Sequence, residues 1–315
     1  MKRFLVAIVG VGFLLAVAQQ APADPLYQWT RTITGDGTTA FSGPQSVTVD
    51  SSNHVWVADY DHDRIVEFNN NGTYANIQFS DSLSGPSGVA VDSLNNVWVS
   101  DQRHNVVKKF TITGSLQGTY NGSDSPQAFY LPYDVAVNSA GTSVWVADDS
   151  LYDVKLNSDG SYSGVRIPSA GSYLTVDSNS NVWIVRSPAE VEEFDSNGNP
   201  AGLIVGSGTL GFPKAVALDS KGDIFVADNY NYKIFEFDST GNLLTTIGAY
   251  GSADGDFLNP WGVAVDSLGN VWVADQGGNR IEEFSPSAVP EPATMMLLGT
   301  GALGLFGYIR RQRMK

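Results

Sequence analysis

The sequence predicts an all-β protein, a β-propeller whose six blades close into a ring. One observation is a pattern that recurs six times, clearest at residues 262–275, where Gly-Val-Ala-Val-Asp precedes Val-Trp-Val-Ala-Asp. Another is its spacing, because the aligned positions 50, 92, 138, 177, 219 and 266 lie about 43 residues apart on average, a period typical of propeller blades or solenoid repeats. The last is that the sixth copy lacks a final strand, which a segment near the N-terminus can supply.

The first element along the chain is a predicted secretory signal peptide. Lys2 and Arg3 precede an apolar run at residues 4–18, and small-residue triplets end at Ala18 and Ala23. A charged start, an apolar centre and a small-residue cleavage site are the pattern of such a peptide. We therefore predict a leader over residues 1–23. An uncleaved anchor helix is the alternative that the pattern leaves open.

Each repeat then predicts three strands with apolar residues at alternate positions. In the last repeat the first strand carries residues 263–265, the second carries Trp272 and the third ends at Phe284. An aromatic side chain recurs at one position of the second strand, which favours packing between blades over a ligand platform. The six residues at this position are Trp56, Trp98, Trp145, Trp183, Phe225 and Trp272.

A tight turn and a fourth strand complete each of the first five repeats. Asn71-Gly72 and Asn197-Gly198 predict two-residue hairpin turns of type I′, which need positive φ at both central residues. The sixth repeat stops after Phe284 without this turn, whereas residues 27–33 resemble a fourth strand such as residues 243–247. We predict that the N-terminal strand completes the last blade, because a closed ring leaves only short edges exposed and the chain has no cysteine for a disulfide.

The repeats resemble those of the NHL family, whose units contain Pro-x-Gly-Val-Ala-Val-Asp, then Val-Trp-Val-Ala-Asp, then Arg-Ile-x-x-Phe. The best matches are residues 260–284 and 44–68, and the resemblance extends over residues 26–285. It implies a six-bladed propeller of NHL type, which we place at residues 24–287. A propeller is a scaffold with many uses, so the resemblance implies the fold and leaves the ligand to be argued from the site.

The C-terminal segment, residues 288–315, predicts a sorting and membrane tail. Pro290-Glu291-Pro292 precedes 17 uncharged residues at 293–309, and Arg310, Arg311 and Arg313 follow. As a helix the uncharged stretch would be about 25 Å long, slightly short of a bilayer core. The basic residues after it would stay on the cytoplasmic side of the inner membrane.

This tail resembles the PEP-CTERM sorting signal of Gram-negative bacteria, which combines a Pro-Glu-Pro motif, an apolar helix and an Arg-rich end. The resemblance implies an exosortase-type membrane protease as a partner that acts near Pro290-Glu291-Pro292. It also implies export across the inner membrane, transient insertion of the tail, and then a place at the cell surface or in the extracellular matrix, in association with exopolysaccharide.

The net charge limits the class of partner. The formal charge of the chain is −15, and residues 20–290 contain 12 Lys and Arg against 32 Asp and Glu, a net −20. Nucleic-acid binding depends on clustered basic residues, so this charge argues against a nucleic-acid partner. It is compatible with cations, neutral glycans or basic peptides, and it also serves solubility.

Five second strands end in an aspartate, and the loops after them share one face of a propeller. These residues are Asp59, Asp101, Asp148, Asp228 and Asp275. One interpretation is a structural network, because a base follows five residues after three of them and can pair with the carboxylate. The other is a carboxylate ring that binds a cation or a polar ligand, with Tyr60, Tyr230 and Arg186 on the same face.

Histidine is scarce, and two of the three histidines suggest a metal hypothesis. His62 and His104 each lie three residues after a loop aspartate on adjacent repeats. With nearby carboxylates they could bind a divalent cation such as Zn²⁺ or Ca²⁺, although Asn231 at the same position favours an ordinary loop substitution. The metal hypothesis corresponds to a metal-dependent lyase or lactonase, because such enzymes occur on related propellers.

The residues favour a binding module over an enzyme. No nucleophile–base pair and no converging set of metal ligands is evident in the repeats. We therefore expect a secreted scaffold that engages an extracellular protein or polysaccharide without a cofactor. The metal-dependent lyase or lactonase is the alternative.

Overall fold

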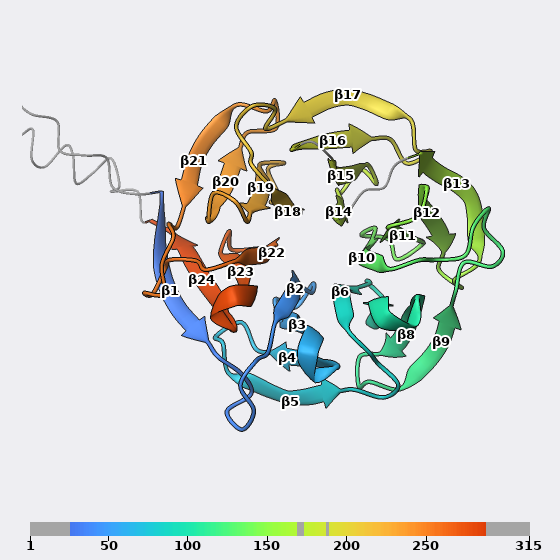
Figure 1. Cartoon of the computed structure of the whole chain (residues 1–315), viewed down its shortest axis with the longest axis horizontal. Helices are drawn as coiled ribbons and strands as arrows, with labels where there is room; N and C mark the ends of the chain where they lie inside the picture. Colours follow the sequence, from blue (N-terminus) through green and yellow to red (C-terminus); the bar gives the residue numbers. More distant parts are fainter. Residues whose placement is uncertain (1–25, 169–172, 187–188, 288–315) are drawn as a thin grey trace, which may run out of the picture.

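The computed structural model describes residues 26–168, 173–186 and 189–287. Within them, 24 strands form six four-stranded antiparallel sheets. Figure 1 shows these sheets as blades around a central axis, with the first strand of each blade innermost. The predicted all-β, six-bladed propeller is confirmed.

The blades follow the repeats in order. Blade 1 contains β2 (Pro44–Val49), β3 (Val55–Asp59), β4 (Arg64–Phe68) and β5 (Tyr74–Phe79), and blade 2 contains β6 (Pro86–Val91), β7 (Asn96–Asp101), β8 (Val106–Thr111) and β9 (Leu116–Tyr120). Blade 3 contains β10 (Pro132–Val137), β11 (Ser143–Asp148), β12 (Tyr152–Asn157) and β13 (Tyr162–Pro168), and blade 4 contains β14 (Tyr173–Val176), β15 (Val182–Arg186), β16 (Glu190–Phe194) and β17 (Pro200–Val205). Blade 5 contains β18 (Pro213–Leu218), β19 (Ile224–Asp228), β20 (Lys233–Phe237) and β21 (Leu243–Ile247), and blade 6 contains β22 (Pro260–Val265), β23 (Val271–Asp275), β24 (Arg280–Pro286) and β1 (Tyr27–Ile33).

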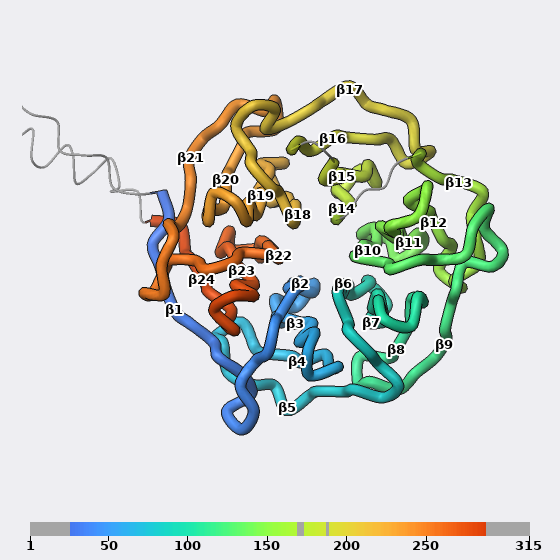
Figure 2. Tube along the Cα trace, in the orientation of Figure 1, coloured from blue at the N-terminus to red at the C-terminus, as the bar shows by residue number. Residues whose placement is uncertain are grey.

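Blade 6 is built from both ends of the propeller, as predicted. Strand β1 pairs antiparallel with β24, with Tyr27 opposite Pro286 and Ile33 opposite Ile281. Figure 2 shows the N-terminal segment along the outer edge of this blade before it turns inward to β2. The pairing gives the last blade its fourth strand and fastens the ring.

The recurring aromatic residue packs between blades, as its repeat position predicts. Trp272 of blade 6 lies in a buried cluster with Val47 and Phe68 of blade 1, and Trp56 of blade 1 lies in a cluster with Val97 of blade 2. Both indoles are fully buried. Each blade therefore contributes a large aromatic group to the hydrophobic core that it shares with the next.

The hairpin turns differ from the predicted type I′. Gly72 and Gly198 have positive φ, of 76° and 78°, but the preceding Asn71 and Asn197 do not. The Gly72 amide donates to the Asn69 carbonyl, and the Asn69 amide donates to the Thr73 carbonyl. This is a type I turn followed by one left-handed residue, so only the glycine must adopt positive φ.

The geometry of the blades defines one face on which the candidate residues lie. Pro44 is opposite Asp59 and Pro260 is opposite Asp275, so first strands begin where second strands end. We call this the loop face. The inner strands surround a central cavity of about 220 Å³ that includes Thr48 and Asp134.

Two predicted segments lie outside the described residues: the signal peptide at residues 1–23 and the C-terminal tail at residues 288–315. Among the described residues, the structure contains no helix with the length and apolar character needed to cross a membrane.

Candidate functional site

The loop aspartates bind the backbone of the segment that enters each blade. Oδ1 of Asp59 accepts from the Ser42 amide at 2.8 Å, and Oδ1 of Asp101 accepts from the Ser84 amide at 2.8 Å. Asp148, Asp228 and Asp275 accept in the same way from the amides of Tyr130, Gly211 and Phe212, and Leu258 and Asn259. All five side chains are buried. The geometry gives these carboxylates a structural role, and ligand binding by them stays a prediction.

Basic side chains neutralise several of these carboxylates. Arg64 Nε lies 2.7 Å from Asp59 Oδ2, and Arg280 Nε lies 3.1 Å from Asp275 Oδ2. Lys108 pairs with Asp101 in the same way, although it lies seven residues after the aspartate and not five as in the sequence pattern. By contrast, the described residues show no ion pair between Lys233 and Asp228, although their strands place them opposite each other.

Blade 3 has no base at this position. Asp153 lies there instead, and its Oδ1 accepts from the Asp148 amide at 3.2 Å. Burial raises the pKa of Asp148 to about 6, although hydrogen bonds from Ser150 and the Tyr130 amide lower it. This carboxyl therefore titrates closer to neutrality than an ordinary aspartate.

His62 and His104 each contact the aspartate of their own blade. His62 Nδ1 lies 3.0 Å from Asp59 Oδ2, and His104 Nδ1 lies 2.9 Å from Asp101 Oδ2. The structure does not bring the two imidazoles into one group of metal ligands within its described ranges. A metal site at His62 and His104 stays a prediction.

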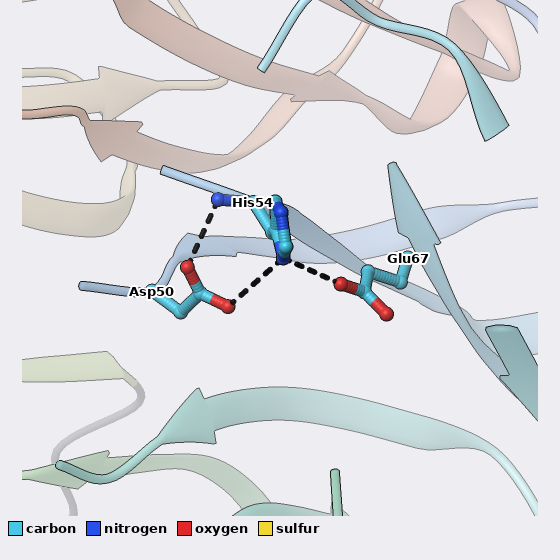
Figure 3. A group of neighbouring side chains, drawn as sticks. All are labelled: Asp50, His54 and Glu67. Atoms are coloured by element: carbon cyan, nitrogen blue, oxygen red, sulfur yellow. Dashed lines mark hydrogen bonds and ion pairs between the residues drawn. The ribbon is translucent and has the colours of Figure 1, made fainter. Parts of the chain in front are cut away.

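A compact group that could hold a metal lies on the opposite face of blade 1 (Figure 3). His54 Nδ1 lies 2.7 Å from Glu67 Oε1 and 3.6 Å from Asp50 Oδ2. Burial raises the pKa of Glu67, against the opposing effect of His54. One imidazole and two carboxylates are ligand types that Zn²⁺ accepts.

The same bridge in blade 4 uses an amide. Asn181 Nδ2 donates to Asp177 Oδ2 at 3.1 Å and to Glu193 Oε1 at 3.0 Å. An amide nitrogen does not ligate Zn²⁺, and it nonetheless joins the two carboxylates at this repeat position. We therefore interpret His54 as a structural donor between Asp50 and Glu67.

The other predicted residues are dispersed over the loop face. Arg186 pairs with Glu192 at 2.5 Å in its own blade. Tyr60 donates to Gln102 at 2.8 Å, whereas Tyr230 is 72% exposed. The structure does not bring these three side chains together.

The sequence interpretation did not identify Asp134, which lines the central cavity. Its Oδ1 accepts from the Val135 amide and its Oδ2 from the Leu174 amide. Burial raises its pKa to about 7, against these two hydrogen bonds. Its repeat position could have indicated it, because an aspartate there replaces the glycine found in blade 2 (Gly88) and blade 6 (Gly262).

Comparisons with protein-family models give two matches. The PEP-CTERM protein-sorting motif matches residues 288–312, and the NHL repeat matches residues 41–68, 83–110, 210–237 and 257–284. The NHL matches lie in blades 1, 2, 5 and 6. A search of curated proteins gave no match.

Solved structures with the same fold include three that illustrate its range. A virginiamycin B lyase from Staphylococcus aureus is 14% identical, with a TM-score of 0.59 over 83% of this chain and 100% of the other. A gluconolactonase from Xanthomonas campestris is 14% identical, with a TM-score of 0.61 over 78% of this chain and 87% of the other. A protein of unknown function from Bacteroides thetaiotaomicron is 16% identical, with a TM-score of 0.63 over 80% of this chain and 72% of the other. At these identities the likeness shows the fold alone.

Proposed function

We propose that this chain, a six-bladed propeller with NHL repeats and a PEP-CTERM sorting motif, is a surface-sorted scaffold that binds a protein or glycan of the extracellular matrix. The motif implies export and recognition by an exosortase, a membrane protease. The rigid loop face and the acidic net charge support a matrix protein or glycan as the partner.

The main support for a surface-sorted propeller is that its last strand ends just before the sorting motif begins. Strand β24 ends at Pro286, and the Ser287 amide donates to the Leu26 carbonyl at 2.8 Å. The motif begins at residue 288. Processing within the motif would therefore remove no strand, and the ring closed by β1 and β24 would keep all of its pairing.

The chemistry of the loop face supports binding rather than catalysis. The loop aspartates bond to backbone amides, and Arg64, Lys108 and Arg280 pair with three of them. Such paired, buried groups hold the loops in place. The loops then present a rigid surface, which reduces the ordering cost of binding a partner.

Binding to matrix fractions tests this function. The full-length chain is mixed with extracellular matrix from the producing cells, separated into polysaccharide and protein fractions, and bound protein is measured by sedimentation. We expect saturable binding to one fraction, competed by excess unlabelled chain. If binding to both fractions is absent or cannot be competed, the scaffold function is wrong.

A further inference from the structure

We propose that the loop-face mouth of the central cavity binds a carboxylated sugar, such as a uronic acid unit of a polysaccharide. The site is built from Lys214 of β18, Trp261 of β22 and Tyr173 of β14, with Phe212 beside it. This inference rests on the proposed function, because it names the chemical class of the glycan.

Lys214 is a cation surrounded by aromatic rings. Its Nζ lies 4.1 Å from the centre of the Phe212 ring, 4.4 Å from Trp261 and 5.7 Å from Tyr173. These distances lie within the range of cation–π attraction. The rings therefore hold the ammonium at the mouth of the cavity.

The Lys214 ammonium also lacks an anionic partner among the described residues, since burial alone perturbs its pKa and no charged group contributes. Other bases on the loop face, Arg64, Lys108 and Arg280, pair with buried carboxylates. Burial lowers the pKa of Lys214, as expected for a half-buried ammonium without a counter-ion. A ligand carboxylate would supply that counter-ion.

The aromatic side chains form a fixed wall beside this cation. The Trp261 indole N–H donates to the Tyr173 hydroxyl, and the two rings meet edge to face at 6.3 Å. Tyr173 also contacts Tyr133, at 6.0 Å between ring centres. Trp261 is half-buried and Phe212 is 52% exposed, so both rings can pack against the C–H face of a sugar ring.

The adjoining cavity supplies polar groups for sugar hydroxyls. Asp134 and Ser46 line it together with Tyr173 and Trp261. The pKa of Asp134 is raised to about 7 by burial, so near neutrality its carboxyl can donate as well as accept hydrogen bonds. A simple carboxylate would satisfy Lys214 alone, whereas a sugar acid also offers a ring to the aromatic wall and hydroxyls to Asp134 and Ser46.

These groups occur on one side of the ring of blades. The first strand of blade 1 begins Pro44-Gln-Ser and that of blade 2 begins Pro86-Ser-Gly, whereas blades 3, 5 and 6 begin Pro132-Tyr-Asp, Pro213-Lys-Ala and Pro260-Trp-Gly. The position after the proline therefore carries an amide or a small side chain in blades 1 and 2 and an aromatic or charged one in blades 3, 5 and 6. Such asymmetry in a repeat fold marks positions that the blade architecture does not require.

Calorimetric titration tests the site. The full-length chain is titrated with a trimer of galacturonic acid, with the methyl ester of that trimer and with a trimer of galactose. We expect the acid to bind at least 10-fold more tightly than either neutral trimer. Lys214→Met should reduce affinity for the acid at least 10-fold, whereas Lys214→Arg should retain most of it.

Lys221→Met is the matched control, because the Lys221 side chain is 79% exposed and lies 3.8 Å from Asp219 on the opposite face. It should leave affinity for the acid unchanged. Equal affinity for the acid and the ester would overturn the site. So would an equal loss of affinity for the acid in Lys214→Met and Lys221→Met. Absence of acid binding together with saturable matrix binding would reject the sugar-acid site and leave the scaffold function standing. Loss of both would reject the scaffold as well.

Discussion

Tyr27 and Pro286 lie opposite each other in blade 6, although they stand at the two ends of the propeller sequence. This pairing makes the last blade depend on the first strand of the fold. Ile33 lies further along the same strand, opposite Ile281, and joins a buried cluster with Phe41 and Phe68. The closure is therefore both a set of backbone hydrogen bonds and a hydrophobic contact.

Ile33→Ala should destabilise the propeller by about 2–4 kcal/mol, because it empties a buried site at the closure. The measurement is urea unfolding followed by circular dichroism. Gln28→Ala, on the exposed part of the same strand, should change stability by less than about 0.5 kcal/mol. Equal effects from the two variants would show that the closure carries little of the stability.

Arg64→Met should lower the free energy of unfolding by about 3–5 kcal/mol, because it leaves buried carboxylates without their cation. Arg64 contacts Asp59 at 2.7 Å and Asp36 at 2.6 Å, and all three side chains are buried. Arg103→Met is the control, because its pairs with Asp61 and Asp63 are exposed and should contribute at most about 1 kcal/mol. Chemical unfolding of both variants measures the difference, and a small loss for Arg64→Met would contradict a structural network.

The pKa of Asp134 predicts a pH dependence of stability. The folded-state pKa of about 7 lies above the ordinary value of 3.8, so the folded state binds the proton more tightly. The stabilisation is fully present below about pH 4 and is lost as the pH rises through 7. Asp134 is only half-buried at the cavity, so solvent screens its charge. We therefore expect the free energy of unfolding to change by about 1–2 kcal/mol over this pH range.

Asp134→Asn provides the comparison, because asparagine carries no charge at any of these pH values. Its melting temperature should exceed that of the natural sequence at pH 8 by more than it does at pH 4. A difference between the two proteins that does not change with pH would show that Asp134 titrates normally.

His54→Asn should leave stability within about 1 kcal/mol of the natural value, because Asn181 makes the same bridge in blade 4. His54→Ala should cost about 1–3 kcal/mol, since it removes the donor between Asp50 and buried Glu67. Thermal melts with and without Zn²⁺ separate this role from a metal site. A Zn²⁺-dependent rise in melting temperature that His54→Asn abolishes would contradict the structural role.

The repeats predicted the fold well because each blade must bury the same face against its neighbours. Trp272 and Trp56 lie between blades, and β1 completes blade 6 as residues 27–33 suggested. The turn type was wrong, because Asn-Gly also suits a type I turn followed by a left-handed glycine, and only backbone angles distinguish the two.

The candidate site was harder to predict. Asp59 and Arg64 share a repeat pattern, so the sequence identified their contact. The contacts of Lys214 with Trp261 and Tyr173 join three blades, and only the curvature of the closed ring brings those first strands together at one mouth. Departures from the repeat at Asp134 and Tyr173 were visible in the sequence, but their convergence was not.

The most direct test of a surface-sorted propeller is the location and intact mass of the mature chain in the cells that produce it. Cell fractionation followed by mass spectrometry measures both. We predict a chain in the surface or extracellular fraction that starts near residue 24 and has been cut within the motif at residues 288–312. A full-length chain that stays in the cytoplasm would contradict it.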